Sequence, residues 1–300
     1  MSDHGDDHHG HGPPGHDLGL RADLATLATL ATLTGRQRRL GRRGMLGLLG
    51  GAGLAGLVGC APGTDAGAGS AATSTASTAT GSTGGVTTTA AGSCEAIPEE
   101  TAGPYPADGS NGPDVLGRSG VVRGDIRSSF GSASGTAEGV PLTVTLTVLD
   151  LAAGCAPFAG AAVYLWHCDR DGGYSMYSPE IADQNYLRGV QAAGRDGGLT
   201  FTSIFPAAYS GRWPHLHFEV YPSLGDAAGA SGRLATSQLA LPADVCDTVY
   251  ATDGYARSAQ NLRRTSLDTD MVFRDGHRAQ LATVTGSVAD GYAATLTVAV

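Results

Sequence analysis

An all-β fold, an antiparallel β-sandwich, is predicted for residues 94–300 of this 300-residue chain. Short runs alternate apolar with polar residues, glycine-containing turns separate the runs, and few stretches have a helical period. Residues 140–150 (VPLTVTLTVLD) show the alternation most clearly, because Leu142, Val144, Leu146 and Val148 share one face and threonines the other. Such a strand places one face in a core and the other near solvent.

The other predicted strands follow along the chain with similar lengths. They are residues 161–167, 199–204, 215–221, 234–240, 279–285 and 293–300. Arg-Asp-Gly-Gly at 195–198 and Ala-Asp-Gly at 289–291 lie between neighbouring runs and are typical of hairpin turns. About 207 residues are enough for one hydrophobic core, so residues 94–300 are predicted to form a single domain.

Residues 1–59 are predicted to be an export signal with a His-rich extension. Five arginines lie between positions 36 and 43, and the fifteen residues of 45–59 carry no charge. That run is shorter than the roughly 20 residues that cross a bilayer, but it suits the apolar part of a signal peptide. The pair Arg42-Arg43 resembles a twin-arginine signal, which exports folded proteins.

Residues 60–93 are predicted to be a lipidation site followed by a flexible tether. Leu57-Val58-Gly59-Cys60 resembles a bacterial lipoprotein processing site, although Cys60 as an ordinary residue after a cleavage site is the alternative. Residues 61–93 are almost wholly Ala, Gly, Ser and Thr, a composition that buries too little apolar surface to fold. The sequence thus predicts an exported, extracytoplasmic lipoprotein, held to a membrane only through an N-terminal lipid anchor.

Charge and composition exclude several classes of function. All 19 basic residues are Arg, so Schiff-base and P-loop lysine chemistry is excluded. A formal net charge of −9 argues against a nucleic-acid partner. Five of the nine histidines lie in the first sixteen residues, where metal binding is a minor alternative. Four histidines remain for the domain, namely His167, His215, His217 and His277.

The domain also carries Cys94, Cys155, Cys168 and Cys246, which outside the cytoplasm predict two disulfides. Their pairing is open. A Cys94–Cys246 bond is plausible, and a Cys155–Cys168 bond requires the chain to fold back along a strand. A cysteine metal site is the minor interpretation, since no CxxC pair exists.

His215 and His217 lie two residues apart on a predicted strand, so both imidazoles leave the same face. Leu216, Phe218 and Val220 then take the other face into the core. Two imidazoles on one strand make half of a metal site, and a solvated His-x-His face is the alternative. His167 is expected to be structural and His277 to lie in a turn.

Three segments together resemble the intradiol ring-cleaving catechol dioxygenases. They are ETAGPY at 100–105, LWHCDRDGGYS at 165–175 and IFPAAYSGRWPHLHF at 204–218. The resemblance implies a β-sandwich with one mononuclear non-haem Fe(III) ion. The implied ligands are Tyr174 and His215 in equatorial positions and Tyr209 and His217 in axial positions, with Arg212 as the active-site arginine.

The resemblance also implies a reaction. Both atoms of O2 enter a catechol, a small aromatic diol, and the ring opens between the two hydroxylated carbons to a muconate-type diacid. Fe(III) is a hard cation that suits phenolate oxygen. We expect Tyr209 to leave the ion and act as a base, and Arg212 to supply a fixed positive charge. Tyr105, Asp169 and Trp213 are expected to line the substrate pocket.

Two other interpretations stay open. One is a surface-anchored β-sandwich binding module with a degenerate or structural metal site. The other is a Zn or Cu site built on the two histidines, which the phenolate pair disfavours. The chain also departs from the family, because Arg212-Trp-Pro-His215 stands where relatives carry Arg-Pro-Ala-His. The catechol used and the oligomeric state are left open.

Overall fold

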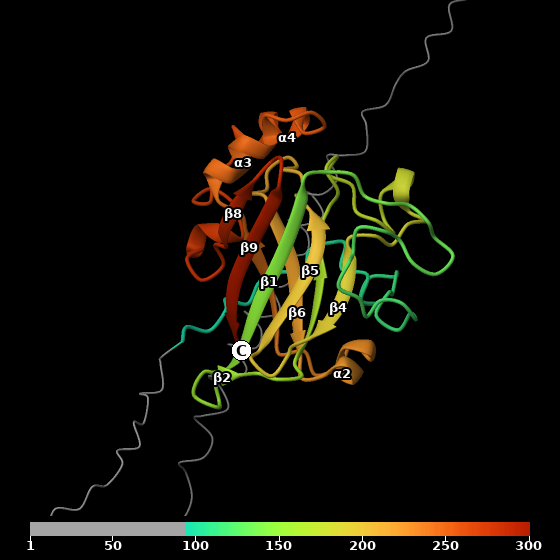
Figure 1. Cartoon of the computed structure of the whole chain (residues 1–300), viewed down its shortest axis with the longest axis vertical. Helices are drawn as coiled ribbons and strands as arrows, with labels where there is room; N and C mark the ends of the chain where they lie inside the picture. The colour runs from blue at the N-terminus through green and yellow to red at the C-terminus, as the bar shows by residue number, and fades with distance from the viewer. Residues whose placement is uncertain (1–93) are drawn as a thin grey trace, which may run out of the picture. The chain divides into compact units, whose positions relative to one another are not determined.

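The computed structural model describes residues 94–300, and the predicted signal, Cys60 and the tether lie outside the described residues. Figure 1 shows two layers of β-strands with short helices at their ends. Within residues 94–300, no helix is long and apolar enough to cross a membrane.

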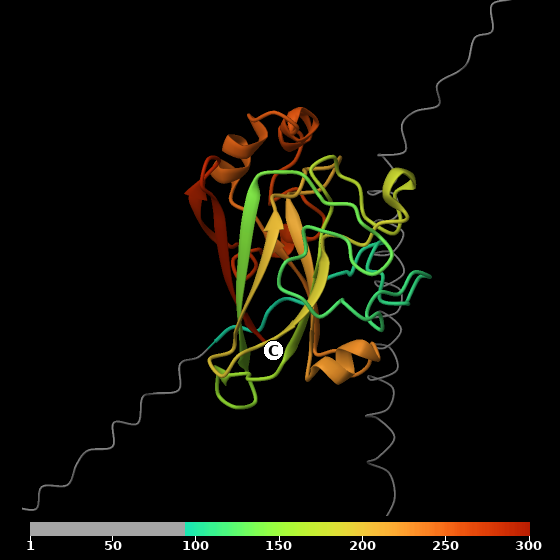
Figure 2. The same cartoon turned by 45° about the vertical axis from the view of Figure 1, so that its right-hand side comes forward.

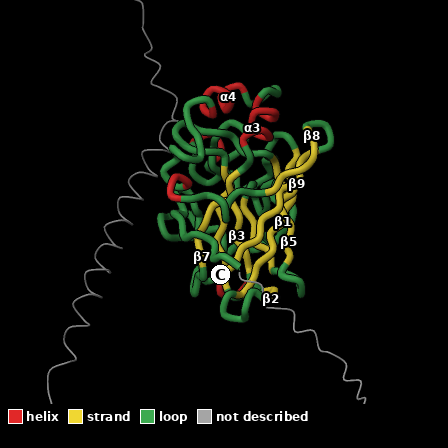
Figure 3. The backbone as a smooth tube through the Cα atoms, turned by 90° about the vertical axis from the view of Figure 1, so that its left-hand side faces the viewer, coloured by secondary structure: helices red, strands yellow, loops and turns green. Residues whose placement is uncertain are grey.

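The strands form two sheets. The first has the order β2 (Ala156–Pro157), β1 (Pro141–Asp150), β9 (Gly291–Ala299) and β8 (Thr283–Ser287), and β5 (Gly198–Ile204) also pairs with β1. The second has the order β4 (Arg188–Ala192), β3 (Ala162–Trp166), β6 (His215–Tyr221) and β7 (Ala235–Ala240). Figure 3 places β3 and β7 on one side and β1, β5, β8 and β9 on the other. The predicted β-sandwich is confirmed, and within its mainly antiparallel sheets β1 and β9 run parallel.

The helices lie at the ends of the sandwich. α3 (Ala243–Tyr250) and α4 (Ala256–Leu262) lie at one end and α2 (Leu224–Ala228) near the other, as Figure 2 also shows. Two 3-10 turns, η2 (Pro179–Ile181) and η3 (Phe273–Asp275), complete the described elements. The end with α3 and α4 is the one at which β6 begins, because His215 pairs with Ala240 just before α3.

The alternation of β1 has the predicted effect. Leu142, Val144, Leu146 and Val148 are buried between the sheets, while the threonines between them are partly exposed. The predicted strand at 279–285 is displaced, since β8 begins at Thr283. β4 was not predicted, because RGVQA is short and polar and its arginine is buried by contacts with distant segments.

β6 is buried on both faces, which the sequence pattern did not indicate. Leu216, Phe218 and Val220 point into the core between the sheets, as predicted. The face with His215 and His217 is also buried, because the segment that leads into the domain packs over the second sheet. Its covering residues include Ala107, Val115, Leu116 and Val121. Polar side chains, among them His215, His217 and Arg188, are thereby buried under this cover together with apolar ones.

The prediction of two disulfides was wrong. One disulfide joins Cys94 to Cys155, with 6.0 Å between the Cα atoms, and Cys168 and Cys246 are free and buried. The backbone of Ile97 bonds to Ala299 at the end of β9, which brings the start of the domain beside the β1–β2 turn. Cys94 thus meets Cys155, while Cys246 packs in the core from α3.

Candidate metal centre

Four predicted side chains meet on the enclosed face of the second sheet. The Tyr174 hydroxyl lies 3.5 Å from the Tyr209 hydroxyl, which lies 3.1 Å from Nε2 of His215. Nε2 of His215 is in turn 3.1 Å from Nε2 of His217. Two hydroxyl oxygens and two imidazole nitrogens therefore converge on one point in the domain.

The two histidines reach this point from neighbouring positions on β6. Nδ1 of His215 donates to the carbonyl oxygen of Trp213, so Nε2 carries the lone pair that faces the other donors. The ring of His217 stacks on Trp166, with 5.0 Å between the ring centroids. Nδ1 of His217 is buried with no hydrogen-bond partner within the described domain. Both rings are thus held in place, and His217 keeps one unsatisfied nitrogen.

Burial keeps both imidazoles neutral. The pKa of His215 lies well below its ordinary value because of burial and then because of the positive charge of Arg212. Burial, and then the neighbouring His215 and Arg212, lower the pKa of His217 in the same way. Neutral imidazole is the form that binds metals, so the site favours ligation over protonation.

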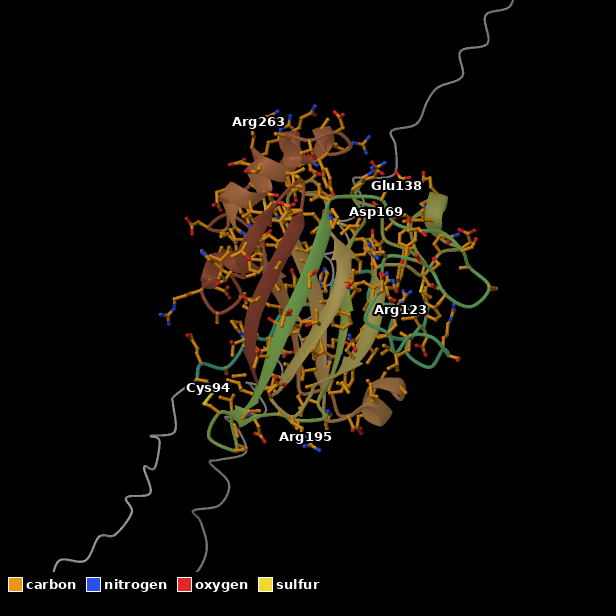
Figure 4. All side chains as sticks on the ribbon, in the orientation of Figure 1. Cys94, Arg123, Glu138, Asp169, Arg195 and Arg263 are labelled. Atoms are coloured by element: carbon orange, nitrogen blue, oxygen red, sulfur yellow. A yellow bond between two sulfur atoms is a disulfide. The ribbon has the colours of Figure 1, made fainter. Side chains whose placement is uncertain are left out.

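Tyr174 lies in a tight turn after β3. Gly172 has a φ of +90°, a conformation that glycine adopts without strain, and an added Cβ would approach Cβ of Tyr209 to 3.6 Å. Oδ1 of Asp169 accepts from the backbone N–H of Gly173 at 2.8 Å and of Asp171 at 3.0 Å. These two bonds fix the backbone of the tyrosine turn. Burial raises the pKa of the Asp169 carboxyl. Asp169 lies at the end of the sandwich opposite Arg195 (Figure 4).

Tyr209 is positioned by α4. The backbone N–H of Ala208 donates to Oγ of Ser258 at 3.1 Å, and Nδ2 of Asn261 donates to the Ala208 carbonyl at 2.9 Å. Tyr209 keeps partial exposure, whereas Tyr174 is 2% exposed. Sequence reasoning missed Ser258 and Asn261, because their contact with the tyrosine loop spans about fifty residues of chain.

Arg212 is fully buried beside the histidines and is held by two residues that sequence reasoning also missed. Nε of Arg212 donates to Oδ2 of Asp270 at 3.0 Å, and Nη2 donates to Oε1 of Gln238 at 2.6 Å. Gln238 lies on β7 directly opposite His217. Asp270 is 58 residues from Arg212 along the chain, and no local pattern marks it. The guanidinium orientation is therefore set by the C-terminal part of the domain.

The three expected substrate-pocket residues are placed differently. The ring of Tyr105 lies 4.9 Å from that of Tyr174, beside the candidate centre. The Asp169 carboxyl bonds to the backbone of the Tyr174 turn. Trp213 is buried in the core between the sheets, where Nε1 donates to the Leu241 carbonyl at 2.8 Å. The ring of Trp213 therefore packs away from the site, and the expectation that it contacts substrate was wrong.

The other histidines do not join the centre. Both ring nitrogens of His167 are hydrogen-bonded, Nε2 to Oγ of Ser203 and Nδ1 to the Cys168 carbonyl, each at 2.7 Å. His277 contacts the Phe273 carbonyl after η3. Across residues 94–300, no group of three or more His, Cys, Asp and Glu side chains could hold a metal ion. The candidate centre is of a different kind, because two of its four donor atoms are tyrosine oxygens.

The donor spacing fits one metal ion. Two ligand atoms about 2.0–2.1 Å from an ion, at angles of 90–120°, lie about 2.9–3.6 Å apart. The three separations of 3.5, 3.1 and 3.1 Å fall in that range. His217 departs from the usual pattern, in which a metal-ligating histidine donates its other ring N–H to a partner, because its Nδ1 has no partner among the described residues.

Comparisons with known proteins cover the part of the chain that contains this site. A family model described as Dioxygenase matches residues 112–228, which include both tyrosines, both histidines and Arg212. Chlorocatechol 1,2-dioxygenase of Rhodococcus opacus is 43% identical over 53 residues, which are 18% of this chain and 21% of that protein. The chain thus matches about a fifth of the length of this curated relative.

A solved structure shares the fold. The intradiol ring-cleavage dioxygenase of Tetranychus urticae is 24% identical, with a TM-score of 0.55 over 69% of this chain and 94% of that chain. The central part of the domain is therefore similar to the dioxygenase family and to a chlorocatechol 1,2-dioxygenase, and the domain shares its fold with an intradiol ring-cleavage dioxygenase.

Proposed function

We propose that this protein is an Fe(III)-dependent intradiol dioxygenase. The single observation that carries the proposal is the convergence of the Tyr174, Tyr209, His215 and His217 donor atoms on one point of the domain. These four side chains would hold the ion. When bound, Fe(III) would hold the catechol oxygens and make the ring electron-rich enough to react with O2.

The charge of the donor set supports a trivalent ion. Two phenolates together with one hydroxide balance three positive charges, and a neutral site is cheaper to bury than a charged one. A catechol bound as a dianion in place of the hydroxide and one phenolate again gives zero. Substrate exchange then needs no large change in buried charge. Zn²⁺ or Cu²⁺ with two phenolates and a hydroxide would leave the site negative.

The two protons that a catechol loses on binding assign a role to Tyr209. A catechol must lose two protons to bind as a dianion, and a released phenolate is a base for one of them. Tyr209 is the more exposed of the two tyrosines, and its loop is held by α4 rather than by the sheet. We therefore assign the movable position, and the base, to Tyr209 and the fixed position to Tyr174.

Arg212 would hold the developing anion. Its guanidinium is fixed by Asp270 and Gln238, so it can present positive charge without reorganising during the reaction. The overall change adds both atoms of O2 to the catechol and breaks the bond between its two hydroxylated carbons. The product is a muconate-type diacid with no atoms lost.

The visible spectrum of the iron-loaded protein tests the proposal. Iron bound by tyrosinate should give a red to burgundy colour from ligand-to-metal charge transfer, and catechol with O2 should give a muconate-type product. Tyr209→Phe should shift the colour in a folded protein, and His215→Ala should lose iron. Val148→Ala, a core change on β1 in the sheet that does not carry the histidines, serves as the control. A colourless protein that stays inert to catechols after reconstitution with iron would overturn the proposal.

We also propose that the protein is exported and anchored through a lipid on Cys60. The uncharged run at 45–59 and the position of Cys60 support this. The Cys94–Cys155 disulfide supports it independently, because disulfides persist in oxidising compartments. Cys60→Ala should release the protein from the membrane fraction. Unchanged membrane association would contradict lipid anchoring.

A further inference from the structure

We propose that Arg188 is a positioning residue that holds the Tyr174 turn against the segment leading into the domain. It would thereby set where the Tyr174 hydroxyl lies relative to the other three donor atoms. This inference rests on the proposed function. It concerns a residue of β4 that contacts none of the four candidate ligands through a hydrogen bond.

The side chain of Arg188 is fully buried and makes four hydrogen bonds. Nε donates to Oγ of Ser175 at 3.1 Å, and Nη2 donates to the Ser175 carbonyl at 2.9 Å. Nη1 donates at 3.1 Å both to the Pro106 carbonyl and to the Tyr164 hydroxyl. One guanidinium therefore bridges the residue after Tyr174, the residue after Tyr105, and β3.

These contacts form a closed network. The Tyr164 hydroxyl accepts from Arg188 and donates to the Pro106 carbonyl at 2.6 Å. The guanidinium carbon of Arg188 lies 5.5 Å from the centre of the ring of Tyr177, three residues after Tyr174. The planar fork of Arg suits such simultaneous contacts, because its donors point in fixed directions. The turn and the lead-in segment cannot separate without breaking several of these bonds.

The charge of Arg188 makes a purely stabilising role hard to explain. All four of its hydrogen bonds end on neutral carbonyl or hydroxyl oxygens, and no carboxylate pairs with it in the described domain. Burying an unpaired guanidinium is costly, and an apolar side chain of similar volume often serves a core better. Arg212 differs in this respect, because Asp270 balances its charge. The fork of Arg188 is thus explained best by the geometry that it imposes.

Arg123 offers a matched control for the experiment. Its guanidinium also bonds to backbone carbonyls of the same region, at 2.7 Å from Nη2 to the Arg188 carbonyl and 3.2 Å to the Asn185 carbonyl. Arg123 is partly exposed, and its hydrogen bonds go to the carbonyls of Ser128, Asn185 and Arg188 rather than to Ser175 or Pro106. Arg123→Gln therefore removes bonds to the backbone of the same region, including the Arg188 carbonyl, while the four side-chain bonds of Arg188 to Ser175, Pro106 and Tyr164 are left in place.

The experiment compares Arg188→Gln, Arg188→Lys and Arg123→Gln with the wild-type protein. Each variant is titrated with Fe(III), and the affinity, the charge-transfer band and the thermal midpoint are recorded. We expect Arg188→Gln to bind Fe(III) about 10–100-fold more weakly and to absorb at a shifted charge-transfer wavelength. Loss of a residue that supports a metal ligand typically lowers metal affinity by this factor. Arg188→Lys should resemble Arg188→Gln, because one ammonium cannot replace the fork. Arg123→Gln should lower the midpoint but keep the band and the affinity.

The outcomes separate the two proposals. A wild-type protein without a tyrosinate band refutes the proposed function itself. A normal wild-type band, together with Arg188 variants whose band and affinity match those of Arg123→Gln, refutes the positioning role alone. If Arg188→Gln does not fold, Tyr164→Phe removes one arm of the network while leaving the charge in place. A weakened affinity in Tyr164→Phe supports the role, and an unchanged band and affinity refute it.

Discussion

The buried pair of Arg212 and Asp270 gives the sharpest test of how the site is built. Oδ2 of Asp270 accepts from Nε of Arg212 at 3.0 Å and from the backbone N–H of Trp213 at 2.7 Å. Oδ1 accepts from the backbone N–H of Val272 at 2.8 Å. Both charged side chains are 0% exposed. Asp270→Asn removes the charge and turns an NH2 group toward at least one of these donors.

The expected loss is large. Removing one partner of a buried ion pair costs about 3–5 kcal/mol. For a domain of this size, each kcal/mol lowers the thermal midpoint by about 2–4 °C, so the midpoint should fall by roughly 6–20 °C. Urea unfolding measures the free energy, and a thermal scan measures the midpoint. Catechol turnover should fall as well, because Arg212 loses its orientation.

A surface ion pair provides the control. Asp125 and Arg127 are 2.7 Å apart, but their side chains are 53% and 43% exposed. Asp125→Asn should lower the free energy of unfolding by no more than about 1 kcal/mol. A double variant, Arg212→Met with Asp270→Leu, should recover much of the stability but not the activity, because it leaves no unpaired buried charge. If Asp270→Asn destabilises the protein no more than Asp125→Asn, the reasoning from burial is refuted.

Three further predictions concern other parts of the domain. Burial, followed by repulsion from Asp275, raises the pKa of Glu100 to about 7, so the folded state holds its proton more tightly than the unfolded state. The stability that Glu100 contributes is present below about pH 4.5 and is lost as the pH rises through about 7; urea unfolding should show this loss in wild type and not in Glu100→Gln. The Cys94–Cys155 bond closes a loop with a sequence separation of 61, so its reduction should lower the free energy of unfolding by about 4 kcal/mol. An equal thermal midpoint with and without dithiothreitol would contradict this. Trp213→Phe should lower the thermal midpoint while leaving the KM for catechol unchanged, and a raised KM would restore a substrate contact for that ring.

The sequence alone determined much of the fold and the set of candidate ligands. Alternation with a period of two is a local property, so it predicted β1 and the shared face of His215 and His217 without knowledge of their neighbours. The spacing of Tyr174, Tyr209, Arg212 and the two histidines carried the resemblance to the intradiol family. These inferences needed only residues that are close in sequence or match a known order of motifs.

The tertiary structure decided what surrounds those residues. The side-chain partners of Arg212, Arg188 and the Tyr209 loop come from segments 13 to 82 residues away, and no periodicity connects such distant positions. The pairing of Cys94 with Cys155 depends on the start of the domain meeting the end of β9, and the burial of the histidine face depends on the lead-in segment folding over β6. Local rules set which way a side chain leaves its strand, whereas the packing of sheets and loops sets what it meets.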